Sequence, residues 1–475
     1  MKLFPTRVLP LLLLVLSAFV HPAAPAANAD PAWVKQVGAK TMPTAKATFA
    51  ATKYGAVGDG KTLNTQALQK VIDAAAKKGG VVTLAPGQYL TGSLFLKKGV
   101  ELHLDKGVTL LGSQDLKDYP ERMTRVAGIE MVWPAALINI LDQDNVAITG
   151  EGTVDGQGKP FWDGYWAMRK DYDKKGLRWI VDYDAKRPRL LVMANSSNIT
   201  IKGVTLQRSG FWTVHVLYSK NVTVDGITVR NNLGGHGPST DGIDIDSSSY
   251  VLVQNSDIDC NDDNFCLKAG RDADGLRVNR PAEYIVIQNC VAGAGDGLFT
   301  CGSETSGGIR HVIARNLKAK GTKVGIRIKS ALNRGGTVED IRVDNIEMDG
   351  VGTAILLTMN WNPAYSYSTL PEGYTEATLP AHWKAMLTKV DPEKGLPHFR
   401  DVVISNVKVQ NAKTAISAEG QPNSLLEGMT LDNVTMTAAT AGGLNYAKDW
   451  IIKNVTITAQ DEEPIAVQNS SKIKF

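Results

Sequence analysis

The stretch "NVTVDGITV" (221–229) decides the fold, because its pattern recurs along the chain. Each copy has alternating β-branched residues, a Gly or Asn at the sixth place, and a second alternating piece. Alternation predicts a β-strand. Gly and Asn enter the left-handed backbone region at low cost, so the sixth place predicts a sharp bend between strands. The other copies are "NITIKGVTL" (198–206), "YVLVQNSDI" (250–258), "YIVIQNCVA" (284–292), "HVIARNLKA" (311–319), "DIRVDNIEM" (340–348), "DVVISNVKV" (401–409), "GMTLDNVTM" (428–436) and "DWIIKNVTI" (449–457).

A short strand–bend–strand unit cannot bury its own inner face, whereas a stack of such units encloses a continuous core. The repeats therefore predict an all-β fold, a single-stranded parallel β-helix. The chain lacks the Leu/Asn consensus of leucine-rich repeats and the Trp-Asp signature of propellers. Residues one repeat apart are expected to lie about 4.8 Å apart on neighbouring strands.

The N-terminal part of the chain carries two further signals. Residues 1–29 resemble a secretory signal peptide, with Lys2 and Arg7 before an apolar run (8–20) too short to span a bilayer. "NTQALQKVIDAAAKKGG" (64–80) predicts an amphipathic helix that ends at Gly79, with a cap near 64–78 covering the open end of the stack. We expect an exported protein, periplasmic or extracellular, whose catalytic β-helix domain is 30–475.

The composition of the chain limits the kinds of partner that the protein is expected to bind. The formal net charge is +4, or about +2 without Lys2 and Arg7, which argues against general nucleic-acid binding. No apolar run after the signal is long enough for a membrane span. Export permits disulfides, but small buried thiols are an equally open reading. The four cysteines are Cys260, Cys266, Cys290 and Cys301.

Two segments interrupt the repeats, one from about Trp162 to Tyr183 and an insertion near 359–398. Both are rich in aromatic residues, and the second is also rich in proline. Long segments on a rigid scaffold usually carry function, although a packing flap is the alternative. We name them the first and the second excursion.

The candidate site centres on "DCNDDNFCLKAG" (259–270), where Asp262 stands beside Asp263. Asp241 lies 21 residues before Asp262, about one turn of the stack, so their carboxylates are expected to meet on one outer face. In "GIRIKS" (325–330), Arg327 and Lys329 are two residues apart and point the same way from a strand.

Glycosidic hydrolysis needs such a cluster, because one carboxyl must be protonated and another ionised. Crowded like charges raise one pKa, which supplies the acid. Arg and Lys suit an anionic sugar. Turn-forming Asp residues and a Ca²⁺-binding Asp ladder in "DGIDIDSS" (241–248) are the alternatives.

These stretches resemble glycoside hydrolase family 28, the polygalacturonases, and "YGAVGDGKTL" (54–63) resembles the cap that opens the pectin-degrading, pectate-lyase-like superfamily of right-handed β-helices. The family's Asn-Thr-Asp, Gly-Asp-Asp and Arg-Ile-Lys correspond to residues 239–241, 261–263 and 327–329. The resemblance implies that Asp262 is the general acid, that Asp241 and Asp263 hold and activate water, and that Arg327 and Lys329 bind the uronate.

One motif departs from the family. Gly295-Asp296-Gly297 stands where the family usually has a histidine between small residues. Asp296 would raise the pKa of neighbouring carboxyls or bind sugar hydroxyls, which puts plain polygalacturonan in doubt. His236 and His215 are candidates to replace the histidine, and for His215 a structural role is favoured. The predicted substrate-binding residues are Arg327, Lys329, Asp296, His236, Lys268 and Trp361.

"GSETSGG" (302–308) and "RPRLL" (187–191) resemble the exo-acting branch, in which the excursions would close one end of the groove. Carboxylates on adjacent turns would be close enough to favour a retaining mechanism. The family resemblance, in contrast, implies an inverting one. We therefore predict a secreted, monomeric exo-acting hydrolase of acidic pectic chains with no cofactor or metal. The rivals are a Ca²⁺-dependent pectate-lyase-like enzyme and a non-catalytic carbohydrate-binding β-helix.

Overall fold

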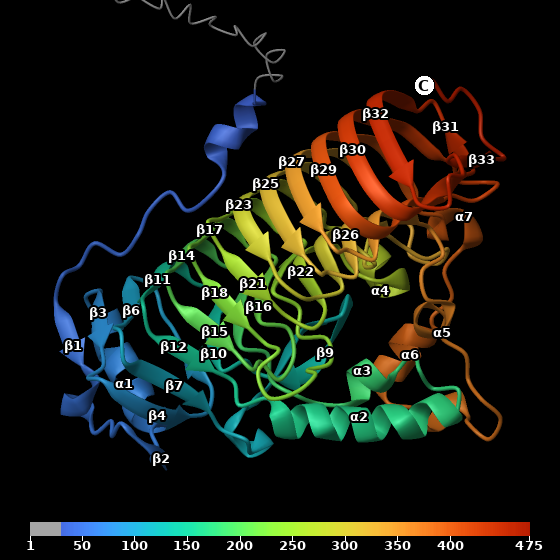
Figure 1. Ribbon diagram of the computed structural model, residues 1–475. Helices are drawn as coiled ribbons and strands as arrows, with labels where there is room; N and C mark the ends of the chain where they lie inside the picture. Colours follow the sequence, from blue (N-terminus) through green and yellow to red (C-terminus); the bar gives the residue numbers. More distant parts are fainter. Residues whose placement is uncertain (1–29) are drawn as a thin grey trace, which may run out of the picture.

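The computed structural model describes residues 30–475 and confirms the parallel β-helix. Figure 1 shows the strands stacked rung upon rung along one axis, from the N-terminal cap to the last C-terminal turns. The predicted signal peptide lies outside the described residues. No helix in the described part of the chain is long and apolar enough to cross a membrane.

The strands pair from rung to rung in three columns. The first column, which carries the candidate site, contains β5 (Leu94–Phe95), β10 (Ile138–Leu141), β13 (Leu191–Ala194), β16 (Val214–Leu217), β19 (Ile243–Asp246), β22 (Asp263–Lys268), β24 (Gly297–Cys301), β26 (Val324–Lys329) and β28 (Thr353–Thr358).

The second column runs through the first halves of the repeats. It contains β1 (Thr48–Ala50), β3 (Gly80–Thr83), β6 (Val100–Leu104), β11 (Asp144–Gly150), β14 (Ser197–Lys202), β17 (Lys220–Asp225), β20 (Ser249–Gln254), β23 (Ala282–Ala292), β25 (Ile309–Lys320), β27 (Thr337–Asp349), β29 (His398–Glu419), β30 (Leu426–Asn445) and β32 (Ile451–Ala459).

The third column begins with separate short strands and merges with the second at β23, which pairs with both β20 and β21. Its separate strands are β2 (Asp59–Leu63), β4 (Gly87–Thr91), β7 (Val108–Gly112), β12 (Thr153–Asp155), β15 (Thr205–Gln207), β18 (Thr228–Arg230) and β21 (Asp257–Asp259). Two short strands, β31 (Ala447–Lys448) and β33 (Ala466–Gln468), pair with β30 near the C-terminus.

The predicted bends are confirmed at every repeat. The backbone angle φ at the sixth place lies between 54° and 80°, in the left-handed region. Neighbouring asparagines at these bends also bond along the stack, as when the Asn345 side-chain amide donates to Asn316 at 2.8 Å and Asn316 donates to Asn289 at 2.9 Å. The sixth-place residues are Gly203, Gly226, Asn255, Asn289, Asn316, Asn345, Asn406, Asn433 and Asn454.

A second left-handed position, which the sequence analysis did not predict, opens each repeat. Its φ angles lie between 48° and 63°, and its residues are mostly Asn, Asp or Gly but include Tyr250 and Tyr284, which have no preference for that region. The rings stack on the outside, with centroids 4.8 Å apart for both Tyr250–Tyr284 and Tyr284–His311. At the tyrosines, contact between rungs therefore supports a conformation that the residue itself does not favour.

The inward-facing side chains form one aliphatic core along the axis. At the N-terminal end, α1 (Thr65–Ala76) confirms the predicted helix and buries Leu68, Val71, Ile72 and Ala75. Before β1, the chain lies as a strap (30–47) along the outside of the stack (Figure 1). In it, η1 (Ala32–Gln36) places Trp33 edge-on against Tyr284 at 5.7 Å, and Asp30 forms an ion pair with Arg315 at 2.8 Å.

Both excursions are largely helical. The first holds α2 (Lys159–Lys174) and α3 (Val181–Asp184), and exposed pairs such as Lys159–Asp163 support α2. The second holds α5 (Pro363–Ser366), η4 (Glu376–Thr378), α6 (Ala381–Leu387) and α7 (Pro392–Gly395). Figure 1 shows both on the side of the first column. The remaining elements are the antiparallel hairpin β8 (Glu121–Val126) and β9 (Ile129–Pro134), α4 (Asp272–Val278), η2 (Ala51–Tyr54) and η3 (Leu116–Asp118).

Candidate active site

The predicted acidic residues come from the short turns that lead into the first column. Asp241 stands two residues before β19, and Asp262 immediately before β22, of which Asp263 is the first residue. Asp296 precedes β24, whereas Arg327 and Lys329 lie within β26. The β-helix therefore presents these side chains from consecutive rungs at one edge of one column.

The register differs from the prediction by one residue. Ile243 pairs with Phe265, an offset of 22 rather than the 21 that separates Asp241 from Asp262. The Asp263 carbonyl accepts a hydrogen bond from the amide N–H of Gly242, the residue after Asp241, at 2.8 Å. Even so, one carboxylate oxygen from each of Asp241, Asp262 and Asp263 lies within 4.8 Å of the other two. The predicted meeting of these carboxylates is confirmed.

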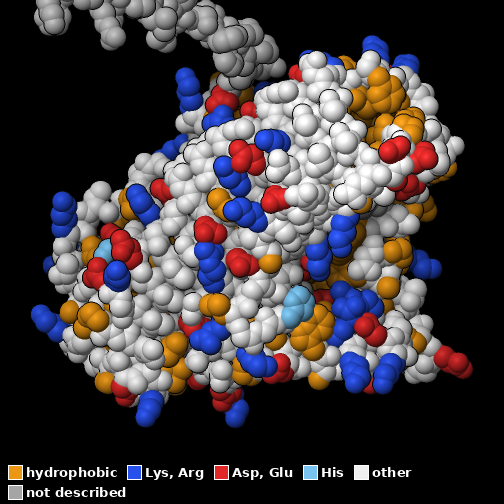
Figure 2. All heavy atoms as spheres, in the orientation of Figure 1, with side chains coloured by type: hydrophobic (Ala, Val, Ile, Leu, Met, Phe, Trp, Pro, Cys, Tyr) orange, Lys and Arg blue, Asp and Glu red, His pale blue; other side chains and the backbone are white. Residues whose placement is uncertain are grey.

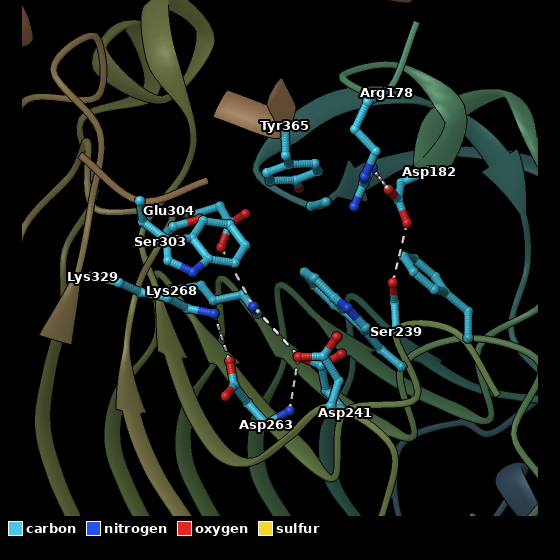
Figure 3. Close-up of a pocket in the computed structure, with 15 residues that line it drawn as sticks. Arg178, Asp182, Ser239, Asp241, Asp263, Lys268, Ser303, Glu304, Lys329 and Tyr365 are labelled. Atoms are coloured by element: carbon cyan, nitrogen blue, oxygen red, sulfur yellow. Dashed lines mark hydrogen bonds and ion pairs between the residues drawn. The ribbon is translucent and has the colours of Figure 1, made fainter. Parts of the chain in front are cut away.

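These three carboxyls line a small pocket (Figure 3). Two indoles, Trp212 and Trp361, form part of its lining. Lys268 lies 4.7 Å from the Trp212 ring centroid and Lys329 lies 4.2 Å from that of Trp361. The pocket thus combines aromatic surface with cations and acids. Its lining residues are Ala127, Arg178, Asp182, Phe211, Trp212, Ser239, Asp241, Asp262, Asp263, Lys268, Ser303, Glu304, Lys329, Trp361 and Tyr365.

Asp263 is the most tightly held of the three acids. Its Oδ1 accepts from Arg327 and, at 2.8 Å, from Thr300, while Oδ2 accepts from Lys329 at 3.0 Å. Burial alone would raise the pKa of Asp263, but Arg327 and Lys329 outweigh it and hold the pKa well below its ordinary value. Asp263 is therefore ionised, and the two cations predicted to bind the uronate lie against it. Lys329 also lines the pocket.

Asp262 and Asp241 have the opposite character. Burial raises the pKa of Asp262 well above its ordinary value, and Asp241, Asp296 and Asp263 raise it further. Burial and the nearby Asp244 likewise raise the pKa of Asp241. The pocket therefore places two carboxyls with raised pKa values beside one with a lowered pKa, and acid–base chemistry uses such a separation of pKa values.

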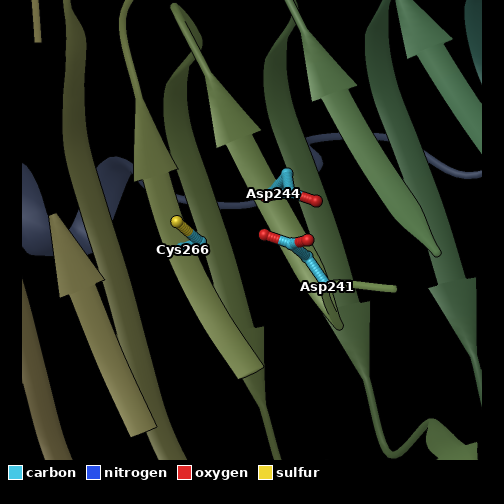
Figure 4. Close-up of side chains that lie close together, drawn as sticks. All are labelled: Asp241, Asp244 and Cys266. Carbon is cyan, nitrogen blue, oxygen red and sulfur yellow. The ribbon is translucent and has the colours of Figure 1, made fainter. Parts of the chain in front are cut away.

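Asp241, Asp244 and Cys266 also come close together, with one side-chain atom from each within 4.8 Å of the others (Figure 4). The ammonium of Lys268 lies 3.5 Å from Asp241 and 3.6 Å from Asp244. Lys268 thus already provides a positive charge to these carboxyls. The cluster also includes the Cys266 thiol, whereas a hard ion such as Ca²⁺ prefers oxygen ligands. The arrangement gives no support to the Ca²⁺ ladder considered from the sequence.

Asp296, which stands where the family usually has a histidine, has a nearby partner of opposite charge. The Asp296 backbone N–H donates to the Asp262 carbonyl at 2.8 Å, so the two residues are neighbours across adjacent rungs. The Asp296 carboxylate lies 2.6 Å from the largely exposed ammonium of Lys323. The charge that replaces an expected imidazole is thus countered by a lysine one rung further along.

The two histidines lie outside the pocket. His236 is exposed, stacks on Trp166 with ring centroids 5.3 Å apart, and its Nδ1 lies 2.7 Å from Asn261 Oδ1. His215 is fully buried, and the Arg189 guanidinium donates to its Nδ1 at 2.7 Å. Burial lowers the pKa of His215 to about 4, so the ring is neutral and structural, as favoured from the sequence.

The sequence reasoning missed several residues that line the pocket. Arg178 and Asp182 come from the first excursion, Tyr365 from the second, and Glu304 from "GSETSGG". No periodic pattern marks them, although the high aromatic content of both excursions was a usable signal. All four cysteines are free, buried thiols, which decides the question left open above.

Comparison with known proteins agrees with this architecture. The family model described as Glycosyl hydrolases family 28 matches residues 84–373, and one described as Rhamnogalacturonase A/epimerase, pectate lyase-like, matches 48–119. A "Probable polygalacturonase" of Vitis vinifera is 31% identical, with 81% of this chain and 73% of the relative covered. An "Exo-poly-alpha-D-galacturonosidase" of Dickeya chrysanthemi is 29% identical, with 76% and 62% covered.

A solved structure extends the likeness to three dimensions. The exopolygalacturonase of Thermotoga maritima superposes with a TM-score of 0.75 at 26% identity, covering 90% of this chain and 94% of that one. Fold and site together define a carbohydrate-degrading β-helix enzyme. The chain belongs to glycoside hydrolase family 28, and its resemblance to the exo-acting branch is supported by these relatives.

Proposed function

We propose that this enzyme hydrolyses α-linked galacturonic acid from the ends of acidic pectic chains. The observation that carries the proposal is a single pocket in which two cations lower the pKa of Asp263, while burial and neighbouring carboxylates raise the pKa values of Asp262 and Asp241. Asp262 serves as the general acid that protonates the leaving oxygen. Asp241 and Asp263 position the attacking water on the other side of the bond.

Removal of terminal units, rather than cutting within the chain, is supported by the two excursions. They supply Arg178, Asp182, Trp361 and Tyr365 to the pocket lining, which supports a pocket that the excursions close and that takes the end of a chain. The predicted product is free galacturonate. Mass spectrometry of products from oligogalacturonides and rhamnogalacturonan oligosaccharides, run in parallel, identifies both the released unit and the preferred linkage.

The reaction is expected to invert the anomeric centre, as the family resemblance implies. The carboxylate oxygens lie within 4.8 Å, which is shorter than the roughly 6.5–9.5 Å typical of inverting pairs. The distance between the carboxylates therefore does not support inversion, and the anomeric form of the product distinguishes the two mechanisms. Proton NMR during the first minutes of hydrolysis distinguishes a β product (inversion) from an α product (retention).

The acid assignment is tested by Asp262→Asn. The variant keeps the shape of the side chain but has no proton to donate to a leaving group, so kcat is expected to fall by about 10²- to 10⁴-fold. Thermal unfolding should occur at or above the wild-type temperature, because a crowded carboxyl is removed. A variant that hydrolyses at the wild-type rate would refute the assignment.

The rival activities give different products. A calcium-dependent lyase would form an unsaturated product that absorbs in the ultraviolet and disappears with chelator. A non-catalytic binding protein would bind oligosaccharide without releasing reducing ends. We further propose export to the periplasm or the medium and a monomeric state, which fractionation of cultures and light scattering of the purified protein test directly.

A further inference from the structure

The wall of the pocket that faces the acids, here called the roof, consists of Arg178, Asp182, Ser239 and Tyr365. Figure 3 shows Arg178 and Asp182 on the side of the pocket opposite Asp263 and Lys329. Arg178 Nη1 donates to Asp182 Oδ2 at 2.6 Å, and its guanidinium lies 4.8 Å from the Tyr365 ring centroid. Ser239 Oγ donates to Asp182 Oδ1 at 3.1 Å.

A second cation, Arg187, lies behind the Arg178–Asp182 pair of the roof. Asp182 is buried, and the Arg178 and Arg187 guanidiniums outweigh the effect of burial and lower its pKa to about 2, so it is ionised. One carboxylate thus faces two guanidiniums, with Arg187 Nη2 3.4 Å from Asp182 Oδ1. Arg187 is enclosed by the rings of Tyr165 and Phe211 and does not line the pocket. Asp182 thus shares its charge between two guanidiniums, of which only Arg178 lines the pocket.

Arg178 also has a donor to spare. Its Nε is buried and finds no hydrogen-bond partner within residues 30–475. Because Nε itself has almost no accessible surface, an anion would meet the part of the guanidinium that lines the pocket, and a charged partner there would strengthen a cation that is not fully satisfied. On the opposite side, the lysines are already engaged, Lys329 with Asp263 and Lys268 with Glu304 at 3.4 Å.

The roof is held rigidly, because the two excursions are locked together behind it. The indole of Trp383 packs edge-on against Trp179 with centroids 5.3 Å apart, and its Nε1 donates to Asp184 at 2.9 Å. Arg178, next to Trp179, is thereby fixed relative to Tyr365. A preorganised cation of this kind binds a carboxylate with little loss of conformational freedom.

We propose that Arg178 binds the carboxylate of the terminal sugar of an acidic chain, and that this contact selects an acidic over a neutral terminal unit. The inference rests on the proposed function and deepens it, since it names the group that reads the end of the substrate. Arg178 acts as a substrate-binding residue, at a distance from the acids that break the bond.

The test compares Arg178→Met with Arg178→Lys and with a matched control, Arg169→Met. Arg169 lies on α2 and pairs with Asp173 at 2.7 Å outside the pocket, so its loss removes a similar ion pair without touching the site. Substrates are trigalacturonate and the same trisaccharide with the carboxyl of its terminal unit reduced to the alcohol. Thermal unfolding of each variant confirms that it folds.

For Arg178→Met we expect KM for trigalacturonate to rise about 10- to 100-fold, with kcat changed far less. The wild-type preference for the acidic over the reduced terminal unit should fall by the same factor. Arg178→Lys should recover part of the affinity, and Arg169→Met should match the wild type. Equal losses on both substrates, or no loss on either, would overturn the proposal.

A binding measurement separates this proposal from the proposed function. In the Asp262→Asn background, calorimetry compares galacturonate with galactose, with and without Arg178→Met. Preference for galacturonate that disappears with Arg178→Met supports the roof contact even if the wild type hydrolyses neither trisaccharide. Preference that survives Arg178→Met refutes the roof contact even if the proposed hydrolysis is found.

Discussion

Replacement of Asp296 by asparagine is expected to make Asp262, the proposed general acid, more acidic. Asp296 stands one rung beyond Asp262, and its negative charge is one of the influences that raise the pKa of Asp262, after burial and Asp241. The other charged groups around Asp262, namely Asp241, Asp263, Arg327 and Lys329, are unchanged by the substitution. Asparagine keeps the size of the side chain, so the comparison isolates the charge.

The size of the effect follows from the spacing of the rungs. Two like charges about 5 Å apart interact by roughly 3 kcal/mol at an effective dielectric constant of about 20. Because one pKa unit corresponds to about 1.4 kcal/mol, an unopposed Asp296 would raise the pKa of Asp262 by about two units. Lys323, 2.6 Å from Asp296, offsets part of this charge. We therefore expect Asp296→Asn to lower the pKa by about one unit.

The assay is the pH dependence of kcat/KM on an oligogalacturonide. The acid must be protonated to act, so activity is lost as pH rises through its pKa. The alkaline limb should move about one unit towards lower pH in Asp296→Asn. In Lys323→Met, Asp296 is left uncompensated, and the limb should move towards higher pH. The control, Lys318→Met, breaks an exposed pair with Glu347 away from the pocket and should leave the limb in place.

Asp296→Asn and Lys323→Met are thus expected to move the alkaline limb of the pH profile in opposite directions. If both variants move the limb in the same direction, or if neither moves it, the charge of Asp296 does not set the acidity of Asp262. In the Asp296→Asn background, the effect of Lys323→Met should be smaller than in the wild type. A full-sized shift there would mean that Lys323 acts on Asp262 independently of Asp296.

Three further predictions concern the scaffold. Arg125→Met should lower the free energy of unfolding at neutral pH by about 3–5 kcal/mol in urea titrations, because it strands the buried Asp246. The Arg125 ion pair, with His215, outweighs burial and lowers the pKa of Asp246, so its stabilisation should be complete above the unfolded carboxyl pKa of about 4 and lost as pH falls below that value. Asn316→Ala should cost about 1–2 kcal/mol and Asn316→Gly less, since only glycine accepts the left-handed bend freely. Trp383→Ala should loosen the excursions and add longer products to the released monosaccharide in chromatograms, whereas Trp383→Phe should not.

The repeats allowed most of the fold to be predicted, because their signal is local. Asparagine at positions such as Asn316 and Asn406 marks a bend by its own backbone preference, and the alternating strands around it identify the inner face. The second bend in each repeat was not predicted, although Asn, Asp or Gly occupies it in most repeats, and at Tyr250 and Tyr284 no residue preference marks it. There the conformation is supported by rings stacked across rungs, a contact that no single repeat contains.

The site residues that lie on the repeat could likewise be predicted from the sequence, and those outside it could not. Asp262, Asp263 and Asp241 could be predicted because the repeat brings residues about one period apart onto the same edge. The one-residue error in register arose because rung lengths vary with the turns between strands. Arg178, in the turn between α2 and α3, and Asp182, in α3, lie outside the repeat, and only tertiary packing brings them to the pocket. The carbonyl of His236 is likewise held by a residue of the first excursion, Trp166.

The strap has a consequence for the order of folding. Most contacts of a stacked fold join neighbouring rungs, so such a chain can grow by adding one turn at a time. The pair between Asp30 and Arg315 instead joins residues 285 positions apart, and Trp33 rests on Tyr284. The strap cannot dock until those central rungs exist, and the loop-closure entropy of a long segment opposes its docking. The strap is therefore expected to dock last, after the rungs that it contacts have folded. In hydrogen exchange, its backbone amides should exchange before those of the stack.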